Sequence, residues 1–314
     1  MDSTEKKQQA IRSRLRVKDG IILVDKEPGF SSFKTVSKIK SLIKAKRAGH
    51  AGTLDPFATG GLIILLNQGT KLFPFLMPHN KVYRAALRLG IETDTQDLTG
   101  KIIGSKDIGG LTYEMIQRTA SQFIGTIKQV PPDYSAVHYG GKRAYELARD
   151  GITIDLKPKD VKIDYITLLL VNLPYVWFEV GCSSGTYIRS LAADLGRSLG
   201  IGAHLTSLRR IKSGTFHVND ALTLEQIAYH LSNGTIEEVI LSLRDALNGM
   251  HEVKITNELA EKIRNGYQPN WEELFRQPTS SFSSNDYLKV ITGEDLVAIL
   301  RKDQSTYKIV KVFT

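Results

Sequence analysis

One carboxylate stands in an unusually permissive stretch of the chain. The stretch is GHAGTLDP (residues 49–56), in which Asp55 precedes a proline, and two further glycines follow at 60 and 61. Glycines permit backbone angles and close approaches that other residues resist, and the proline favours an extended backbone at Asp55. Such a loop can present one carboxylate rigidly to a ligand. The same residue types also form ordinary turns, so the loop alone leaves both interpretations open.

Familiar loop motifs do not account for this stretch. No Gly-Lys-Ser/Thr follows it and no Gly-x-Gly-x-x-Gly opens a helix, which excludes the common phosphate and dinucleotide loops. His50 and Asp55 lack partners at metal-ligand spacing, residues 92–100 miss the calcium-loop pattern, and no nucleophile-elbow serine is present. By elimination, Asp55 is a bare carboxylate that would act as a general base or a nucleophile.

A carboxylate reagent that is partly buried needs a cation beside it to stay ionised. The stretch CSSGTYIRSLAADLG (182–196) offers Arg189, which we expect in the first turn of a helix, where it can pair bidentately with a neighbouring carboxylate. Tyr187 lies in the same turn. Tyr83 is either a core tyrosine or a platform for base stacking, and Leu208 is most simply a core residue. A lone arginine is usually a surface residue, so the pairing is a hypothesis.

Composition favours a polyanionic partner. The 314 residues carry a formal net charge of +9, with 41% hydrophobic and 24% charged residues, which are ordinary globular values. Basic and aromatic residues alternate in KIKSLIKAKR, KVYR, HYGGKRAYELAR and SLRRIK, a mixture that suits stacking on splayed RNA bases with phosphate contacts around them. RNA is therefore the expected partner, although each patch alone is typical of a solvated surface.

Other features of the sequence indicate the cellular compartment and which cofactors are expected. Cys182 is the single cysteine, so neither an internal disulfide nor a cysteine-pair zinc site is expected. The N-terminus lacks the apolar core of a signal peptide, and the longest apolar stretch is too short and polar to cross a bilayer. We expect a cytoplasmic protein that uses no metal and does not enter a membrane.

The elements that must position these residues form an irregular α+β pattern. Strands are expected near 20–29, 62–66, 81–90, 161–170, 175–182 and within 203–218; helices are expected at 31–47, 112–125, 186–200, 223–231 and 235–247. Residues 129–160 mix prolines, glycines, tyrosines and bases, which indicates an excursion from the core with a helical middle. From about 248 the pattern restarts as a small α+β unit, with a strand, one helix (257–266) and then three short strands.

Several long motifs together resemble one family. GHAGTLDPFATGGLIILLNQGTK, KVYRAALRLGIETDTQDLTG, QVPPDYSAVHYGGKRAYELAR and CSSGTYIRSLAADLG occur in the order and spacing of the bacterial tRNA pseudouridine synthase B (TruB) family, and ILVDKEPGFSS and GAHLTSLRRIKSG add two more. The match spans roughly residues 20–215. The resemblance implies isomerisation of one uridine in the T-loop of tRNA, position 55, to pseudouridine, with no cofactor and no metal.

The resemblance also implies roles for individual residues. Asp55 resembles the catalytic nucleophile, with attack at C6 of the uracil or at C1′ of the ribose left open, and Arg189 resembles its ion-pair partner. Tyr83 resembles the ring that stacks under the flipped base and is a candidate for removing the C5 proton. The remaining substrate-binding positions implied by the resemblance are Tyr187 and Leu208 in the uracil pocket, His50 in the space left by the extruded nucleotide, and the basic residues Lys26 and Lys71 near the site.

The implied fold is an α+β pseudouridine synthase core, with a long, largely antiparallel sheet and flanking helices, plus a small PUA-like RNA-binding domain. The expected division is a flexible basic tail (1–18), a catalytic domain (19–247) with a thumb-like insertion (about 129–160) that is mobile without RNA, and the PUA-like domain (248–314). The expected partner is the T-arm of tRNA, bound by a monomer.

Two other functions remain as alternatives: an RNA-folding protein with dispensable catalysis, and a guide-RNA-dependent relative, which the thumb-like insertion disfavours. Two departures from the family, Ser184 and Gly61, bear on affinity rather than on the inferred reagents.

Overall fold

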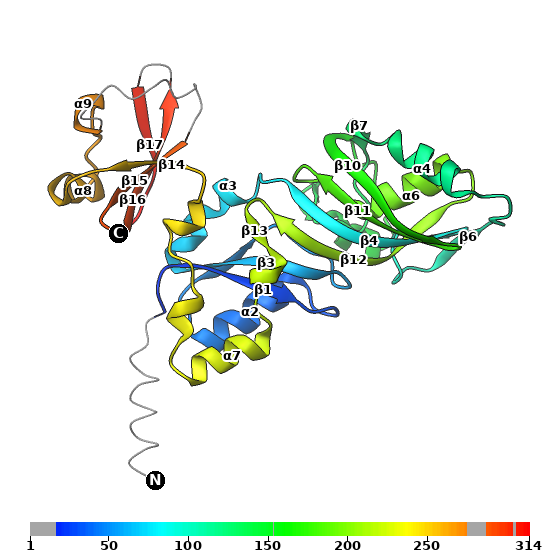
Figure 1. The fold of residues 1–314 in the computed structure, drawn as a ribbon, viewed down its shortest axis with the longest axis horizontal. Coiled ribbons are helices and arrows are strands. Elements are labelled where there is room, and N and C mark those ends of the chain that lie inside the picture. Colours follow the sequence, from blue (N-terminus) through cyan, green and yellow to red (C-terminus); the bar gives the residue numbers. More distant parts are fainter. Residues whose placement is uncertain (1–16, 153, 275–286, 304–305) are drawn as a thin grey trace, which may run out of the picture.

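The computed structural model describes residues 17–152, 154–274, 287–303 and 306–314. Most of the predicted basic tail, residues 1–16, lies outside these ranges. Within them a large sheet runs through the molecule, and a small sheet stands at one end (Figure 1). None of the helices in the described ranges is long and apolar enough to cross a membrane.

The large sheet has nine strands in the described chain, in the order β1-β3-β12-β4-β11-β10-β7, with β2 paired to β3 and β13 to β12. Their bounds are β1 Gly20–Lys26, β2 Ala48–Ala51, β3 Thr59–Leu66, β4 Lys81–Leu89, β7 Gly125–Gln129, β10 Lys159–Asn172, β11 Tyr175–Cys182, β12 Ala203–Ser213 and β13 Phe216–His217. Every pair is antiparallel except β12 and β3, which run parallel where Arg210 faces Gly60. The long, largely antiparallel sheet is thus confirmed.

Strand patterns follow from which faces are covered. In β1 and β3 both faces are buried, because Ile22 and Ile64 pack into one core cluster while Ile21 and Ile63 pack into another. This explains the unbroken apolar run LIILL, which is typical of strands covered on both sides. In β4 apolar and basic residues alternate: Tyr83, Ala85, Leu87 and Leu89 are buried, whereas Arg84 and Arg88 are not, although Ala86 between them is also buried.

Helices cover the sheet in two groups (Figure 1). α2 (Ser32–Ile43) and α7 (Leu224–Ser232) pack together beside β1 and β3, and α4 (Tyr113–Ser121) and α6 (Ile188–Ser198) pack at the other end. Sequence signals set their starts, because Ser31 caps α2 through the Lys34 amide and Thr223 with Gln226 forms a capping box on α7. Other short elements of the large domain include α3 Phe73–Leu76, β5 Ile91–Thr93, β6 Ile102–Ser105 and the 3₁₀ turns η1 Asn67–Leu72 and η2 Val218–Asp220.

The helix predicted at 235–247 is wrong. This stretch forms two short 3₁₀ turns, η3 (Ile236–Val239) and η4 (Asp245–Leu247). Between them Leu241 bridges to Ile21 of β1 through two backbone hydrogen bonds of 3.0 and 2.9 Å. The backbone groups that a helix needs internally are therefore used to extend the sheet edge, so a long-range pairing overrides the local helical periodicity.

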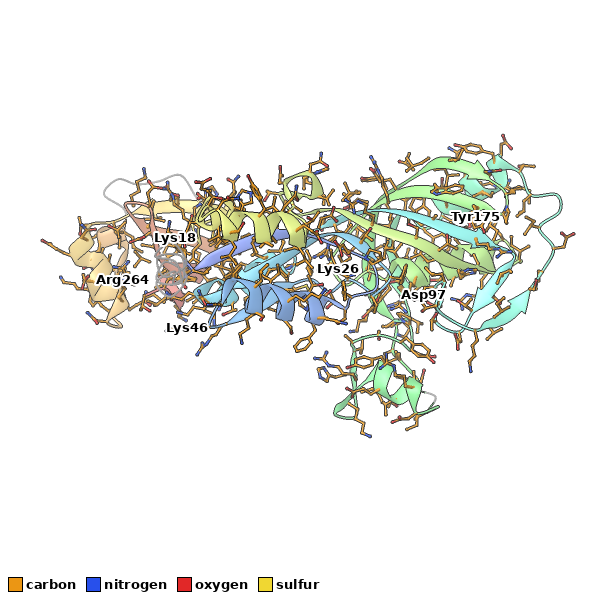
Figure 2. The ribbon with its side chains drawn as sticks, turned by 90° about the horizontal axis from the view of Figure 1, so that it is seen from below. Lys18, Lys26, Lys46, Asp97, Tyr175 and Arg264 are labelled. Atoms are coloured by element: carbon orange, nitrogen blue, oxygen red, sulfur yellow. The ribbon has the colours of Figure 1, made fainter. Side chains whose placement is uncertain are left out.

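Residues 130–158 leave the sheet between β7 and β10 and are called here the thumb segment. It contains β8 (His138–Tyr139), β9 (Lys142–Arg143) and α5 (Ala144–Arg149), and four residues form a small core of its own: Ala144, Leu147, Ile154 and Leu156. Figure 2 shows the segment projecting from the body of the domain. Because its apolar contacts are largely internal, the thumb segment is a satellite of the main core, as the composition predicted.

The C-terminal unit has the predicted strand, helix and three-strand order. It comprises β14 His251–Lys254, α8 Asn257–Arg264, α9 Trp271–Leu274, β15 Tyr287–Thr292, β16 Asp295–Asp303 and β17 Thr306–Val312. Its sheet order is β14-β15-β16-β17. It docks on the large domain through Phe313, which joins the cluster of Ile21 and Ile63, and through an edge-to-face contact of Phe75 with Tyr287, whose ring centroids are 5.1 Å apart.

Candidate active site

The loop that carries Asp55 spans residues 52–58 and connects β2 to β3. It is shorter than the sequence suggested, because residues 48–51 and 59–61 belong to strands. Side chains from two neighbouring elements hold its backbone. The hydroxyl of Ser32 donates to the Leu54 carbonyl (3.0 Å) and accepts from the Leu54 amide (2.8 Å), and the Lys26 ammonium donates to the Pro56 and Ala58 carbonyls at 3.2 and 2.7 Å. Asp55 is thus clamped on both sides.

Two glycines of the loop region are explained by Arg210. Gly60 has φ +100°, and a Cβ there would lie 2.3 Å from the Arg210 carbonyl oxygen, so the parallel pairing of β3 with β12 requires glycine. Gly52 has φ +93°, and its carbonyl accepts a hydrogen bond from Arg210 (3.1 Å). Arg210 is 1% exposed and also donates to the Gly61 carbonyl (2.7 Å). The glycines therefore serve the packing of this arginine against the loop.

Asp55 and Arg189, 134 positions apart in the chain, form a bidentate ion pair. Nε of Arg189 donates to Oδ2 of Asp55 (2.9 Å) and a terminal nitrogen donates to Oδ1 (3.0 Å). The Arg189 side chain is 4% exposed and that of Asp55 is 29% exposed. The guanidinium is therefore buried behind the carboxylate, and the carboxylate retains an accessible side. Such a fork fixes both position and rotation of the carboxylate.

Further contacts make Arg189 the centre of the site. Its guanidinium also donates to the Thr95 carbonyl and to the Tyr134 carbonyl of the thumb segment, both at 3.0 Å. Asp97, 7% exposed, lies 3.7 Å away, and its other oxygen accepts from Thr95 and Thr99. Sequence reasoning missed Asp97, because ETDTQDLTG was tested only as a calcium loop. Figure 2 marks Lys26 and Asp97, which flank the Asp55 region through these contacts.

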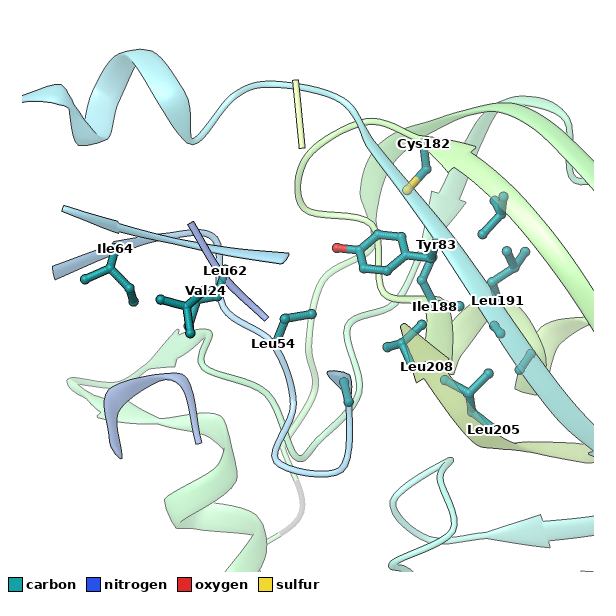
Figure 3. Packing of buried hydrophobic residues seen from close by; sticks show 14 of the residues in the cluster. Val24, Leu54, Leu62, Ile64, Tyr83, Cys182, Ile188, Leu191, Leu205 and Leu208 are labelled. Carbon is teal, nitrogen blue, oxygen red and sulfur yellow. The ribbon is translucent and has the colours of Figure 1, made fainter. Parts of the chain in front are cut away.

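Tyr83 reaches the site from β4. Its ring packs in the main core cluster with Leu54, Ile188 and Leu208, and Figure 3 shows its hydroxyl directed away from Ile188 toward the side on which Leu54 lies. Burial raises the pKa of the Tyr83 phenol, and the adjacent Arg210 guanidinium offsets part of that rise. The phenol is therefore held protonated, next to a cation and within the field of Asp55.

Tyr187 and Leu208 border the same region. Tyr187 occupies the N-cap position of α6 without a side-chain capping hydrogen bond. The side chain of Gln129, itself 1% exposed, holds the Tyr187 backbone by accepting from its amide (2.8 Å) and donating to its carbonyl (3.0 Å). Burial raises the pKa of the Tyr187 hydroxyl, whose neighbours include Arg189 and Asp55. Leu208 is 6% exposed on β12. Gln129 is a second positioning residue that the sequence did not single out.

Two of the basic residues that the sequence predicted for substrate binding, Lys26 and His50, also lie beside the site. Lys26 is 1% exposed, and burial lowers its pKa to about 8, with Asp55 opposing that shift. His50 lies on β2, where burial and then the charge of Arg210 lower its pKa, which favours a neutral imidazole. Among the described residues its Nδ1 is buried and has no hydrogen-bond partner, so a ligand reaches this atom only when neighbouring atoms move.

Lys71 has its contacts elsewhere. Its ammonium donates to Gln68 (2.9 Å) and to the Val312 carbonyl (2.7 Å) and lies 5.4 Å from the Phe313 ring centroid. The structure thus joins Lys71 to the C-terminal unit rather than to the group around Asp55. Its predicted contact with substrate stays a prediction.

Comparison with known proteins identifies the family. Residues 40–188 match the TruB family pseudouridylate synthase N-terminal domain, and residues 189–253 match the tRNA pseudouridylate synthase B C-terminal domain. A tRNA pseudouridine synthase B from Syntrophus aciditrophicus is 41% identical over 284 residues, which cover 90% of this chain and 91% of that protein. The chain belongs to the TruB family of pseudouridylate synthases. It is accordingly an enzyme, an isomerase.

Other TruB relatives and solved structures agree. The homologue from Geobacter sulfurreducens is 35% identical over 302 residues, covering 94% of this chain and 99% of that one. The Cbf5-Nop10-Gar1 complex contains a chain that is 26% identical, with a TM-score of 0.74 over 94% of this chain and 85% of that one. In an H/ACA ribonucleoprotein bound to a substrate RNA, the matched chain is 25% identical with a TM-score of 0.72 over 94% and 85%. These neighbours confirm the α+β pseudouridine synthase fold.

Proposed function

We propose that this TruB-family chain isomerises the uridine at position 55 of the tRNA T-loop, with Asp55 as the nucleophile. The observation that carries the proposal is the Asp55–Arg189 pair: the guanidinium fixes the carboxylate from the buried side, and the 29% exposed carboxylate faces outward. A nucleophile needs this combination of fixed geometry and access.

The reaction is redox-neutral. The bond between N1 of the uracil and C1′ of the ribose breaks, the base rotates, and a bond from C5 to C1′ forms. The C5 proton leaves and N1 gains a proton, so the atoms balance without an oxidant or reductant. Asp55 supplies the attacking oxygen, and its bond to the substrate breaks again as the C5–C1′ bond is completed and the carboxylate is restored. We assign Tyr83 to the C5 proton: because its phenol is protonated, it passes its own proton to N1 or to water as it accepts the one from C5. In the described chain no cluster of three His, Cys, Asp or Glu side chains is placed to hold a metal ion.

The target base must leave its stack to reach Asp55. Flipping a base costs a few kcal/mol, which binding energy elsewhere must offset. Tyr83, Tyr187 and Leu208 supply aromatic and apolar surface for the uracil, and the buried Nδ1 of His50, which has no partner among the described residues, becomes a polar contact once RNA binding exposes it. The thumb segment is coupled to this pocket because the Tyr134 carbonyl accepts from Arg189. We infer that the thumb segment contacts the T-arm and that 248–314 forms a PUA-like module for the rest of the RNA.

A single chain supplies every residue of this site, which supports action as a monomer. A tRNA substrate supports a cytoplasmic location for the reaction. The thumb segment also favours a stand-alone enzyme over a guide-dependent one.

The test uses a T-arm transcript with tritium at C5 of every uridine. The proposal predicts release of one equivalent of tritium per RNA, and no release when the uridine at position 55 is replaced by cytidine. Release that persists from the cytidine transcript would contradict the assigned position. Tight binding without any release from either RNA would support an RNA-folding protein instead.

A further inference from the structure

One aromatic side chain outside the catalytic group is unusually exposed. Phe33, in the first turn of α2, is 75% exposed, the highest value among the exposed large hydrophobic residues of the described chain. A single exposed apolar side chain is ordinary by itself. Phe33 is notable because it lies next to the Asp55 loop and among lysine side chains of the same helix.

Phe33 stands at the edge of the Asp55 loop. The residue before it, Ser32, binds both backbone groups of Leu54 (3.0 and 2.8 Å), and Leu54 precedes Asp55. The Gly29 amide donates to the Pro56 carbonyl (2.8 Å), so the start of α2 is fastened to both sides of the nucleophile. An RNA loop that delivers a base to Asp55 therefore passes beside the first turn of α2.

The same face of α2 is basic. Phe33, Lys34, Ser37 and Lys38 are all exposed, and positions four apart on a helix share a face. The Lys34 and Lys38 ammonium groups lie 4.9 and 3.6 Å from the Phe30 ring centroid. The helix itself contains no acid, and Glu225 of α7 is the acid that interacts electrostatically with Lys38. The exposed Phe33 ring thus shares the first turns of α2 with two cations that lie over the half-buried Phe30 ring, and aromatic rings set among cations bind unstacked nucleotides.

We propose that Phe33 is a stacking platform for an unstacked base next to the target uridine, while Lys34 and Lys38 contact the flanking phosphates. The proposal rests on the function proposed above, since it requires an RNA loop whose target base is flipped into the Asp55 site. Flipping one nucleotide removes the stacking partner of its neighbour, and Phe33 replaces that partner. The platform belongs to the binding surface and does not touch the reacting atoms.

The first test compares Phe33→Ala with Phe33→Trp. Stacking of one base on an aromatic ring predicts that Phe33→Ala weakens binding of the T-arm RNA and raises KM about tenfold, equivalent to about 1.4 kcal/mol, with single-turnover rate at saturation unchanged. Phe33→Trp retains a ring and should bind within about twofold of wild type. The control is Ile103→Ala, which removes a 68% exposed side chain from β6, far from α2 in Figure 1, and should change nothing.

A second test identifies the base. Two proteins are compared, both carrying the non-reacting Asp55→Asn substitution: one keeps Phe33 and the other also carries Phe33→Ala. Their affinities are measured for transcripts with an abasic nucleotide at each T-loop position in turn. At one position next to the target, the abasic nucleotide should lower the RNA affinity of the protein with Phe33 about tenfold. It should not lower the affinity of the Phe33→Ala protein further, because both changes remove the same contact. An equal loss for both proteins at every position would overturn the stacking assignment.

The lysines are tested by salt dependence. Replacing Lys34 and Lys38 together by glutamine should reduce the slope of log affinity against log salt by about 1.4, or about 0.7 for each single-strand phosphate contact. An unchanged slope would remove them from the interface. These outcomes are distinct from failure of the proposed function: if wild type releases no tritium the function fails, whereas normal release with unchanged KM in Phe33→Ala refutes the platform alone.

Discussion

Replacement of Arg189 by lysine tests the geometry of the site while keeping its charge. Arg189 makes four described hydrogen bonds, two to Asp55 and one each to the Thr95 and Tyr134 carbonyls. A lysine ammonium is a point donor that cannot reproduce the planar fork. In Arg189→Lys, Asp55 keeps a cation but loses one of its two fixed contacts and the rotational restraint they impose.

The magnitude follows from the hydrogen bonds that the substitution removes. A hydrogen bond to a charged group contributes about 1.5–3 kcal/mol, so loss of one Asp55 contact predicts a single-turnover rate lower by about 10- to 150-fold, at 1.36 kcal/mol for each factor of ten. The two carbonyl contacts affect folding and thumb placement, and their loss should appear as a lower Tm and weaker RNA binding rather than in the rate at saturation.

The assay is tritium release from the T-arm transcript at saturating enzyme, with Tm measured on the same preparation. The matched control is Arg197→Lys on the same helix, an arginine whose side chain is 58% exposed and pairs with Asp194; it should be near wild type. A rate for Arg189→Lys within threefold of wild type would refute the reasoning, because it would show that charge alone, without the bidentate geometry, suffices for Asp55.

Three further predictions concern other parts of the site. Tyr83→Phe keeps the ring packed on Leu208 but deletes the hydroxyl, so Tm should hardly change while tritium release falls by about 10²- to 10⁴-fold, the range for loss of an acid–base group; an unchanged rate would remove Tyr83 from proton transfer. Burial lowers the pKa of Lys26 from 10.5 to about 8. Between about pH 8 and 10.5 the unfolded state therefore holds this proton more tightly than the folded state, so the free energy of unfolding rises with pH across that range. In urea unfolding across that range Lys26→Met should lack this gain, and parallel pH profiles for variant and wild type would contradict it. Lys71→Met removes the bond to the Val312 carbonyl and should loosen the C-terminal unit by about 1.5–3 kcal/mol, seen as earlier protease cleavage near residue 248, with single-turnover rate on the T-arm intact; a lost rate would favour substrate contact instead.

Local signals in the sequence predicted those parts of the fold that local physics determines. The strand expected near 81–90 forms β4, in which Tyr83 is buried, and the helices expected from 112 and 223 begin at the caps Thr112 and Thr223. The helix predicted at 235–247 was wrong because a distant part of the chain determines the structure there: its backbone pairs with β1. No local pattern reports a partner more than 200 positions away.

In the site, too, some residues could be predicted from the sequence and others could not. Asp55 and Arg189 were proposed as a pair, and the structure places them in bidentate contact. Asp97, Gln129 and Arg210 were missed, because a buried polar residue that braces another group has no periodic signature of its own. The glycine-rich loop was left open between a support for Asp55 and an ordinary turn, whereas Gly52 and Gly60 are required by the approach of Arg210. Only the three-dimensional neighbours distinguish these two reasons for glycine.

The most direct test of the central claim is tritium release by Asp55→Asn compared with wild type on the same transcript. The substitution preserves shape while removing the negative charge and nucleophilicity of the carboxylate. If Asp55 is the nucleophile, wild type releases one equivalent per RNA, and Asp55→Asn binds the RNA with similar affinity and releases none. Appreciable release by the variant would contradict a nucleophilic Asp55, and loss of RNA binding together with activity would make Asp55 a structural residue of its loop.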